Sequence, residues 1–580
     1  MPLVLAVALL GAAVPEPPGA GNAPPPGSPF PSPQRLDDLK QTPLPERLFA
    51  QDVATVEEWT LTGPFPDVVA AVPYRDPTEW GGLLEVAAEQ RAGLVVATEA
   101  MQCAAREWAL FYQEHRTPPG PQLRNYMAAR CSTVAPNVQF HHFEGGVPAG
   151  ASDPEIFESW RGAVASLLSD ALRGGPQTAG IWYGRRDGRA IVVIASGERL
   201  VRVDPLPTAS FDEVRRGDGE FVLSGELLVP ADDVSAAVNV GPFGAAACER
   251  AVAPALPRFA FRCKLDRADA RSWLTVSLTP PGRLLGRSAI DVVLWPSGQP
   301  DPVWRRASRG AAVPLTPETD RAQTLLTLVN RARKEAGREP LALSRPQSRV
   351  ADELAPFYFA SAFGVTPGTG GDLVVLGLLA GWNVEGIVQD ARFTSSWVVK
   401  TADLDHLVAS VLEYPAGRAT LLDPEAEQLA VGTVSHEGSG FLAGIFGTYA
   451  IFEEASHADA ARQVIEALDA ARAGAGKGPV RHLPTVASLG TLAAGRVQSG
   501  EDADVVLGDL LRQSSQVLRR SVNGWILEAR DLAELRFPEA LLARDPVEIA
   551  IGVSHHKPAG EAWGRYVILV VAAEPAGQGA

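Results

Sequence analysis

Three stretches of this sequence repeat one pattern, in which a short apolar run around a glycine leads through a polar turn into a second apolar run. The glycines are Gly180, Gly432 and Gly552, and each stretch follows a helical or leucine-rich segment. The second apolar runs occupy residues 190–195, 442–452 and 566–571. Self-similarity of this kind is typical of folds built from repeated units. We interpret it as three diverged copies of one α/β module; the alternative is a chance resemblance among β-hairpins.

The second and third copies share further residues. Leu421-Leu422-Asp423-Pro424 precedes one glycine, and Leu541-Leu542 with Asp545-Pro546 precedes the other. Each glycine is followed by a Ser-His pair. In the first copy, apolar spacing predicts helices at residues 97–112, 123–130 and 160–172. Asp187-Gly188 between two apolar runs predicts a hairpin turn.

Length and charge limit the class of protein. The chain has 580 residues, of which 46% are hydrophobic and 21% charged, so we expect three or four folded domains. The formal net charge is -16, and no long basic run occurs. An acidic surface repels phosphate backbones, which argues against nucleic-acid binding.

The N-terminal region predicts export. Residues 1–14 form an apolar run that suits a signal peptide and is too short to span a bilayer, although a positively charged start is missing; a disordered apolar tail is the alternative. Residues 15–50 are rich in proline and glycine, and we expect them to form a tether. No later apolar run reaches transmembrane length, and no cysteine stands where a lipid anchor would need one.

Four cysteines fall into two local pairs. We expect disulfides Cys103–Cys131 and Cys248–Cys263 in an oxidising compartment, each worth about 3 kcal/mol in the chain-entropy model. The alternative is four buried thiols. No Cys-x-x-C spacing is present, so zinc ribbons and thioredoxin-like chemistry find no support. Short apolar runs between glycines and prolines predict a small antiparallel β-sandwich at residues 205–308, which the second disulfide would join.

A helix is predicted to open at Thr316, with Pro317 in its first turn and Gly337 at its end. Within it, Asn330 and Arg333 followed by Gly337 and then Pro340-Leu341 resemble the opening helix of bacterial CAP-superfamily domains. These domains are relatives of cysteine-rich secretory, antigen 5 and pathogenesis-related proteins. The resemblance implies a three-layer α-β-α sandwich over residues 316–455.

Weaker matches extend this resemblance. Ala380-Gly381-Trp382, Tyr414-Pro415-Ala416-Gly417-Arg418 and Val431-Gly432 are similar to later steps of the family pattern. Pro356 departs from it, because we expect a proline to interrupt the second helix. Residues 474–478 resemble a linker to the third copy.

The family cleft often binds a divalent cation through two His and two Glu, and this sequence departs from that set. Gly417 stands where the family has one His, and residues 363–370 contain no His for the other. Glu385 remains in the place of one family glutamate, and a lone carboxylate is too few ligands for zinc. We therefore predict no metal, no cofactor and no catalytic residue. If the cleft keeps polar residues, they are Glu385 and Arg418.

Other metal-binding and catalytic motifs find little support in the sequence. His141-His142 and His555-His556 are neighbours on expected strands, so their side chains point to opposite faces and do not chelate one ion easily. No nucleophile elbow, phosphate loop or zinc helix is present.

These observations combine into one expected organisation. The fold class is α+β, with CAP-like α-β-α sandwich modules at residues 51–200, 316–455 and 479–573 and the β-sandwich between the first two. The resemblance implies a secreted or envelope-associated, non-catalytic protein that binds a lipid, a glycan or a protein. The alternatives are a hydrolase or peptidase with a site assembled between modules, and a structural component of the envelope.

Overall fold

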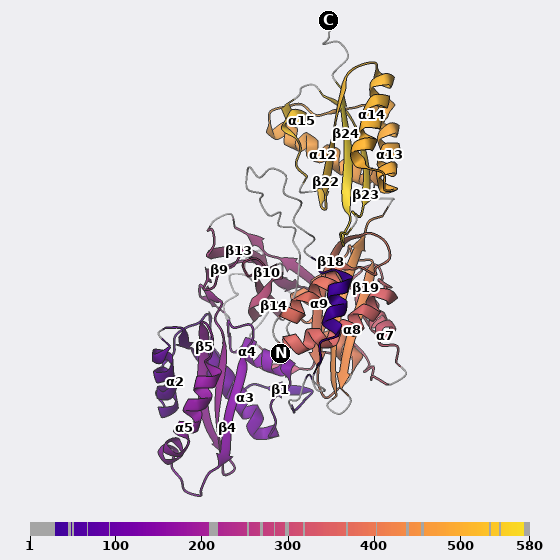
Figure 1. Cartoon of the computed structure of the whole chain (residues 1–580). Helices are drawn as coiled ribbons and strands as arrows, with labels where there is room; N and C mark the ends of the chain where they lie inside the picture. The colour runs from indigo at the N-terminus through magenta and orange to yellow at the C-terminus, as the bar shows by residue number, and fades with distance from the viewer. Residues whose placement is uncertain are drawn as a thin grey trace.

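A computed structural model of the chain contains both helices and sheets, as the α+β class requires (Figure 1). It describes residues 30–44, 48, 52–66, 68–91, 93–207, 219–251, 254–266, 271–283, 285–295, 301–316, 319–366, 369–401, 403–436, 440–453, 457–532, 535–543, 547–558 and 560–573. The predicted signal peptide and residues 15–29 of the tether lie outside these ranges, as do Pro317, Asp545 and Pro546. None of the described helices is long and apolar enough to cross a bilayer.

The first module is a four-stranded sheet with helices, and its strand order is β3-β5-β6-β4. Its elements are α2 (Glu79–Gln90), β3 (Val95–Ala97), α3 (Glu99–His115), α4 (Pro121–Arg130), β4 (Gln139–Gly146), α5 (Asp153–Ala171), β5 (Gln177–Arg186) and β6 (Arg189–Glu198). β3 runs parallel to β5, and the other pairs are antiparallel. The predicted hairpin turn is present, with positive φ angles of 53° at Asp187 and 72° at Gly188.

The second and third modules have the same strand order, β17-β19-β20-β18 and β21-β23-β24-β22. The second comprises α7 (Arg321–Glu335), β17 (Ala342–Leu343), α8 (Arg345–Ala362), α9 (Thr369–Ala380), β18 (Val388–Val398), α10 (Leu404–Leu412), α11 (Pro415–Leu421), β19 (Gln428–His436) and β20 (Phe441–Ile451). The third comprises α12 (His457–Gly474), β21 (Arg481–His482), α13 (Pro484–Gln498), α14 (Ala503–Leu518), β22 (Val522–Ala529), α15 (Glu539–Ala543), β23 (Glu548–His556) and β24 (Arg565–Ala573). In both, only the first pair of strands is parallel.

Helices cover both faces of each sheet. In the first module, Ile191, Val193 and Ala195 of β6 cluster with α3 and α4, whereas Val192 and Ile194 cluster with α2 and α5. Successive side chains of a strand point to opposite faces, so this alternation defines two buried interfaces. Strands β20 and β24 divide their apolar residues between two clusters in the same way.

The three repeated glycines lie where a helix crosses the sheet. A Cβ atom built on Gly180, Gly432 or Gly552 would lie 2.2, 2.2 or 2.0 Å from the nearest backbone atom of α3, α8 or α13. Only a residue without a side chain permits this approach of helix to strand. The shared pattern seen in the sequence therefore corresponds to one packing contact that occurs in all three sheets.

Two local expectations in the second module are corrected. Helix α7 begins at Arg321 rather than at Thr316, because the carboxylate of Asp320 accepts a hydrogen bond from the backbone N of Gln323 (3.1 Å) and caps the helix. Pro356 does not interrupt the second helix, since α8 continues through it. The packing of α8 against β19 and α9 compensates for the backbone hydrogen bond that proline cannot donate.

A β domain follows the first module. Its strands are β7 (Val201–Val203), β9 (Glu220–Leu227), β10 (Asp233–Val240), β11 (Gly244–Ala247), β12 (Glu249–Arg250), β13 (Arg258–Lys264), β14 (Ser272–Thr279) and β15 (Arg287–Leu294). They form two antiparallel sheets, in the orders β12-β13-β9-β7 and β11-β10-β14-β15. Buried residues of both sheets belong to one cluster, which includes Phe261 and Val276.

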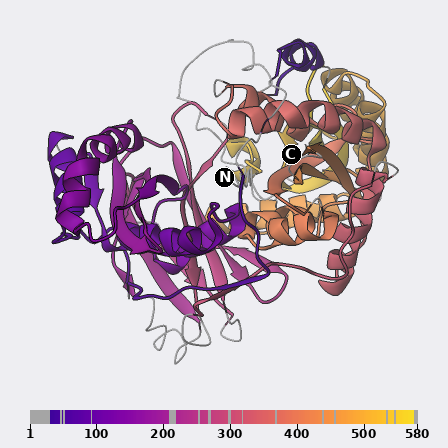
Figure 2. The ribbon, with the colours of Figure 1, turned by 90° about the horizontal axis from the view of Figure 1, so that it is seen from below.

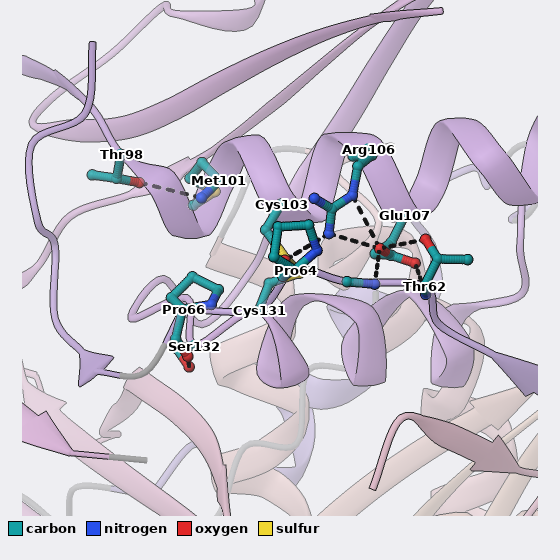
Figure 3. Close-up of a disulfide and its surroundings, with 11 residues drawn as sticks. Thr62, Pro64, Pro66, Thr98, Met101, Cys103, Arg106, Glu107, Cys131 and Ser132 are labelled. Carbon is teal, nitrogen blue, oxygen red and sulfur yellow. Dashed lines mark hydrogen bonds and ion pairs between the residues drawn. A yellow bond between two sulfur atoms is a disulfide. The ribbon is translucent and has the colours of Figure 1, made fainter. Parts of the chain in front are cut away.

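Both predicted disulfides are confirmed. Cys103–Cys131 and Cys248–Cys263 have Cα atoms 5.6 and 4.5 Å apart. The first joins α3 to the end of α4, beside the fully buried Glu107 (Figure 3). The carboxylate of Glu107 accepts hydrogen bonds from the backbone N atoms of Thr62 (3.0 Å) and Gly63 (3.1 Å), so it attaches the segment before α2 to α3.

The proline- and glycine-rich region differs from a free tether. Within the predicted tether at residues 15–50, residues 30–44 are folded and include helix α1 (Pro33–Lys40). Leu36 of α1 is buried against the helices α8 and α9, and the Lys40 Nζ lies 2.6 Å from a carboxylate oxygen of Glu353. The composition of this segment correctly indicates that it has little apolar surface. It does not indicate that this surface is buried against the second module.

The first module, the β domain and the second module meet at α4. In Figure 2 the first module (indigo to purple) and the second (salmon to orange) lie on either side of the β-domain strands (magenta). On α4, the Gln122 Nε2 donates to the carbonyl of Trp397 (2.7 Å) and the Asn125 Nδ2 donates to the hydroxyl of Tyr414 (3.0 Å). The Tyr414 ring in turn lies 4.6 Å from that of Trp273 in the β domain.

The third module contacts the second through the turn between β23 and β24. The indole N of Trp563 donates to the carbonyl of Leu379 (2.8 Å), and the backbone N of Gly564 donates to the carbonyl of Val388 (2.9 Å). The ring of Phe30 lies 5.0 Å from that of Trp563. The N-terminal segment therefore also contacts the third module.

Candidate functional site

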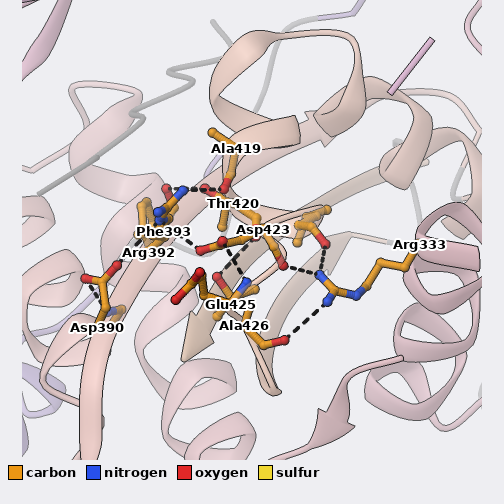
Figure 4. A network of polar contacts seen from close by, with 12 residues as sticks. Arg333, Asp390, Arg392, Phe393, Ala419, Thr420, Asp423, Glu425 and Ala426 are labelled. Carbon is orange, nitrogen blue, oxygen red and sulfur yellow. Dashed lines mark hydrogen bonds and ion pairs between the residues drawn. The ribbon is translucent and has the colours of Figure 1, made fainter. Parts of the chain in front are cut away.

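The predicted motif residue Arg333 has a structural position. It is fully buried, and its guanidinium donates to the carbonyls of Glu339 (2.6 Å), Leu421 (3.0 Å), Asp423 (2.9 Å) and Ala426 (3.2 Å) (Figure 4). Hydrogen bonds from a charged donor to backbone carbonyls are strong in a buried environment. Arg333 therefore joins the end of α7 to the loop before β19, and its guanidinium is not accessible to a ligand.

The other motif residues support the same turn. The Asn330 side chain donates to the carbonyl of Leu341 (2.9 Å) and accepts from its backbone N (2.8 Å). Gly337 ends α7 with a φ of +67°, a left-handed conformation that favours glycine. Asn330 thus holds α7 to the residue that precedes β17, and Gly337 ends the helix.

The third module contains the same arrangement, which was not recognised from the sequence. Asp469 accepts from the backbone N of Val480 (2.7 Å), and Arg472, fully buried, donates to the carbonyl of Leu541 (3.0 Å). Gly476 has a φ of +71°. The spacing of Asp469, Arg472 and Gly476 equals that of Asn330, Arg333 and Gly337. That spacing was visible in the sequence, but its glycine, Gly476, falls in the run 474–478 that resembles a linker.

The two predicted cleft residues have different surroundings. Arg418 donates from its Nε to the carbonyl of Leu412 (2.9 Å) and from its Nη1 to those of Gly241 (2.8 Å) and Gly244 (3.1 Å). It therefore links the second module to the β domain. Glu385 is exposed in the connection between α9 and β18. A ligand-binding role for either residue stays a prediction.

A polar network lies beside the Arg333 contacts (Figure 4). The Arg392 Nε lies 3.0 Å from a carboxylate oxygen of Asp423 and 3.6 Å from one of Asp390. Burial raises the pKa of Asp390, and the neighbouring Arg392 opposes that shift. The other carboxylate oxygen of Asp423 accepts from the backbone N of Glu425 (3.1 Å). One guanidinium thus offsets two carboxylates, as expected of a network that orders a loop.

Side chains of the types that bind metals are dispersed over the residues that the structure describes. No group of three or more His, Cys, Asp or Glu side chains among them is arranged to hold a metal ion. Gly417, where the family has a His, packs so closely that a Cβ would lie 1.9 Å from the carbonyl oxygen of Val411. A histidine does not fit at this position in the present backbone. The loss of the family metal site itself stays a prediction.

The first module has an aromatic and polar cluster between α3 and β4. The Trp108 ring is nearly parallel to that of Tyr112 (5.2 Å between centroids), and the His142 ring lies 5.1 and 4.7 Å from them. The Tyr112 hydroxyl donates to Glu144 (2.9 Å), which also lies 3.1 Å from Arg189. Burial lowers the pKa of His142 and raises the pKa of Tyr112 to about 12.

The opposite face of β4 is aromatic as well. The Phe143 ring packs edge-on against Trp160 of α5 (5.1 Å), and a Cβ on Gly145 would lie 3.1 Å from the Trp160 ring. Because neighbours alternate along a strand, His141 shares this face while His142 faces α3. The two histidines therefore do not face one ion.

Strand β4 is the last strand of its sheet, and among the described residues no strand pairs with its outer edge. Just beyond it, the backbone N of Val147 donates to the carbonyl of Gly188 (2.9 Å). In an antiparallel pair, residues that hydrogen-bond to the neighbouring strand alternate with residues that do not. Because Val147 bonds to Gly188 and the register is regular, the odd-numbered residues of β4 are the ones that bond to β6. The residues whose N–H and C=O groups point outward are Phe140, His142, Glu144 and Gly146. Across the described part of the chain, nothing is hydrogen-bonded to these outward groups.

The corresponding edge of the second module is used inside the molecule. On β18, the carbonyl of Phe393 accepts from the Thr420 hydroxyl (3.3 Å), and the carbonyl of Trp397 accepts from the Gln122 side chain (2.7 Å). β4 thus differs from β18, and it can be followed in Figure 1 between α3 and α5.

Comparisons with known proteins give few parallels. No protein-family model matches the sequence, and no curated protein matches it. A cysteine-rich secretory protein from Staphylococcus aureus is 11% identical, over 40% of this chain and 82% of that one, with a TM-score of 0.17. An extracellular protein with an SCP domain from Bacillus anthracis is 15% identical, over 46% and 84%, with a TM-score of 0.18. Na-ASP-1 is 9% identical, over 64% and 91%, with a TM-score of 0.16. TM-scores this low do not establish a common fold.

Proposed function

We propose that this chain is an exported, non-catalytic binding protein that takes a protein ligand through the open edge of β4. Its three modules would be diverged copies of a CAP-like unit, as the opening-helix motif suggests. In this proposal the second module holds the other modules and the β domain together, and the first module provides the binding surface. The observation that carries the proposal is the row of outward main-chain groups on β4.

The edge of β4 lacks the features by which proteins usually protect such edges. Natural edge strands carry lysine, proline or a bulge, or are covered by another segment. β4 contains neither lysine nor proline, and its register with β6 is regular throughout. All eight residues of β4 are partly exposed or exposed, although helices α3 and α5 pack on the two faces of its sheet. An open edge explains that exposure.

The chemistry of this edge favours a polypeptide over a glycan or a lipid. Main-chain donors and acceptors at every second residue match the spacing of another extended chain, which is the basis of strand addition. The half-buried aromatic rings on both faces would contact alternate side chains of the added strand. Two charged residues of the second module, Arg333 and Arg418, donate to backbone carbonyls rather than facing a small ligand.

Export is supported by the two disulfides. Disulfides persist in oxidising compartments and are rare in the reducing cytosol. Both bridges connect buried cysteines, and no free cysteine occurs among the described residues. A secreted or envelope location is therefore part of the proposal, together with the predicted signal peptide.

A selection from a library of extended peptides tests the binding surface. We expect selected peptides to protect the outward amides of β4 from hydrogen exchange. The variant His142→Pro removes one outward N–H and no bond to β6, so it should weaken peptide binding by about tenfold or more. His142→Ala keeps that N–H and is the matched control, which should bind within about threefold of the unmodified chain. Equal loss in both variants, or protection elsewhere, would reject the proposal.

A further inference from the structure

The residues of β4 are complementary to β4 itself. In an antiparallel pair related by a two-fold axis through position 143, the sequence numbers of facing residues add up to a constant. Phe143 then faces its own copy, His142 faces Glu144, and each bulky residue at 140 and 141 faces a glycine at 146 and 145. Aromatic pairs across strands are favourable, a neutral imidazole can donate a hydrogen bond to a carboxylate, and Gly146 leaves room for a large neighbour because nothing lies within 4 Å of its Cβ position.

We propose that β4 binds β4 of a second copy of this chain, antiparallel and centred on Phe143, which joins the two first-module sheets into one continuous sheet. This rests on the proposed function, because it names the partner of the same edge. The outward groups of His142 would exchange hydrogen bonds with those of Glu144 from the other copy, and Phe140 with Gly146. Each of these residues presents its N–H and C=O outward, so the register satisfies the whole row.

Other two-fold registers fit less well. An axis through His142 would set this imidazole against its own copy and place Phe140 opposite the carboxylate of Glu144. An axis through Glu144 would bring two carboxylates together. Like charges directly opposite one another destabilise a strand pair, so complementarity selects the register centred on Phe143.

The Phe143 pair would also lie at a position that favours close side chains. Phe143 bonds to β6 and is therefore a non-hydrogen-bonded position with respect to the added strand. Facing Cα atoms at such positions are about 4.5 Å apart, closer than at bonded positions. On this face Trp160 already packs against Phe143 and covers Gly145, so an aromatic layer would continue across the dimer axis.

Sedimentation equilibrium of the full chain gives the first test. Between about 1 and 100 μM, a range that brackets transient complexes, we expect a reversible monomer–dimer equilibrium. The variant His142→Pro should shift the midpoint of this equilibrium by about tenfold or more, and His142→Ala by less than about threefold. A chain that stays monomeric over this range would overturn the inference.

Cysteine cross-linking tests the register. In Phe143→Cys the two introduced thiols would face one another at a Cα separation suited to a disulfide, so oxidation should give a covalent dimer. Phe140→Cys is the matched control, because its thiol would face a glycine, and it should cross-link at least about tenfold more slowly. Faster cross-linking through position 140 would overturn the register. If the chain is monomeric but selected peptides still protect β4, this inference fails while the proposed function stands.

Discussion

At the scale of single residues, two buried arginines define loops that have little regular structure of their own. The side chains of Arg333 and Arg472 are fully buried, and their guanidinium N–H groups donate to backbone carbonyls. Five donors in a planar fork allow one arginine to satisfy several carbonyls that water cannot reach. The same spacing of a buried arginine and a glycine with positive φ occurs in two modules.

Replacing Arg333 by lysine tests that role. Lysine keeps the charge but cannot reach four carbonyls, so we expect the free energy of unfolding to fall by about 2–4 kcal/mol. Denaturant unfolding followed by tryptophan fluorescence would measure the change, since Trp397 lies in the same module. Arg349→Lys is the control at an exposed position and should change stability by less than about 0.5 kcal/mol. Equal midpoints for both variants would contradict the structural role of Arg333.

At the scale of elements, the contact between one helix and one strand recurs in each module. Gly180, Gly432 and Gly552 allow α3, α8 and α13 to cross their strands at backbone contact. The helix therefore lies closer to the sheet than a side chain would permit. This contact sets the position of the helix and so the shape of the whole layer.

The substitution Gly432→Ala should disrupt that crossing. The added methyl group would lie 2.2 Å from backbone atoms of α8, which cannot move as a side-chain end can. We expect a loss of about 3 kcal/mol or more in the free energy of unfolding, measured by chemical denaturation. Gly508→Ala in α14 is the matched control, because no atom lies within 4 Å and alanine favours a helix. It should stabilise by about 0.5–1 kcal/mol. A Gly432→Ala variant as stable as the parent would show that the helix is free to shift.

At the scale of the whole molecule, the third module contacts the second at Trp563, whose ring also lies beside that of Phe30 in the N-terminal segment. Trp563 joins Leu379 of α9 and Phe30 of the N-terminal segment. The loop that carries it also bonds to the first residue of β18. Three parts of the chain that are distant in sequence thus meet at one buried indole. In Figure 1 the third module (yellow) lies at one end of the molecule and adjoins the second.

Trp563→Leu should therefore uncouple the third module. The variant loses the indole hydrogen bond and most of the aromatic contact, a loss of about 2–4 kcal/mol. We expect differential scanning calorimetry to show a separate transition of the third module at lower temperature. Trp160→Leu, in the first module, is the control and should leave the coupling of the third module unchanged. A single cooperative transition in the Trp563 variant would mean that other contacts hold the modules together.

Much of the local structure was predictable. The three glycines, the hairpin at Asp187-Gly188 and both cysteine pairs were identified because each depends on a few residues close in sequence. The start of α7 was misplaced by several residues, since Thr316 and Asp320 are both residue types that cap a helix. A strand was expected at His141-His142 but without bounds, because residues 140–143 lack the alternation of apolar and polar residues that marks a half-buried strand.

The sequence by itself determined the repeated strand–turn–strand pattern, the three glycines within it and the two disulfides, because local periodicity and spacing encode them. Only the tertiary structure decided that residues 30–44 pack on the second module and that no strand in the described part of the chain pairs with the outer edge of β4. A buried segment and an open edge are both defined by what lies next to them in space. The candidate site therefore depends on the absence of a neighbouring strand, and no pattern within residues 139–146 reports whether such a neighbour exists.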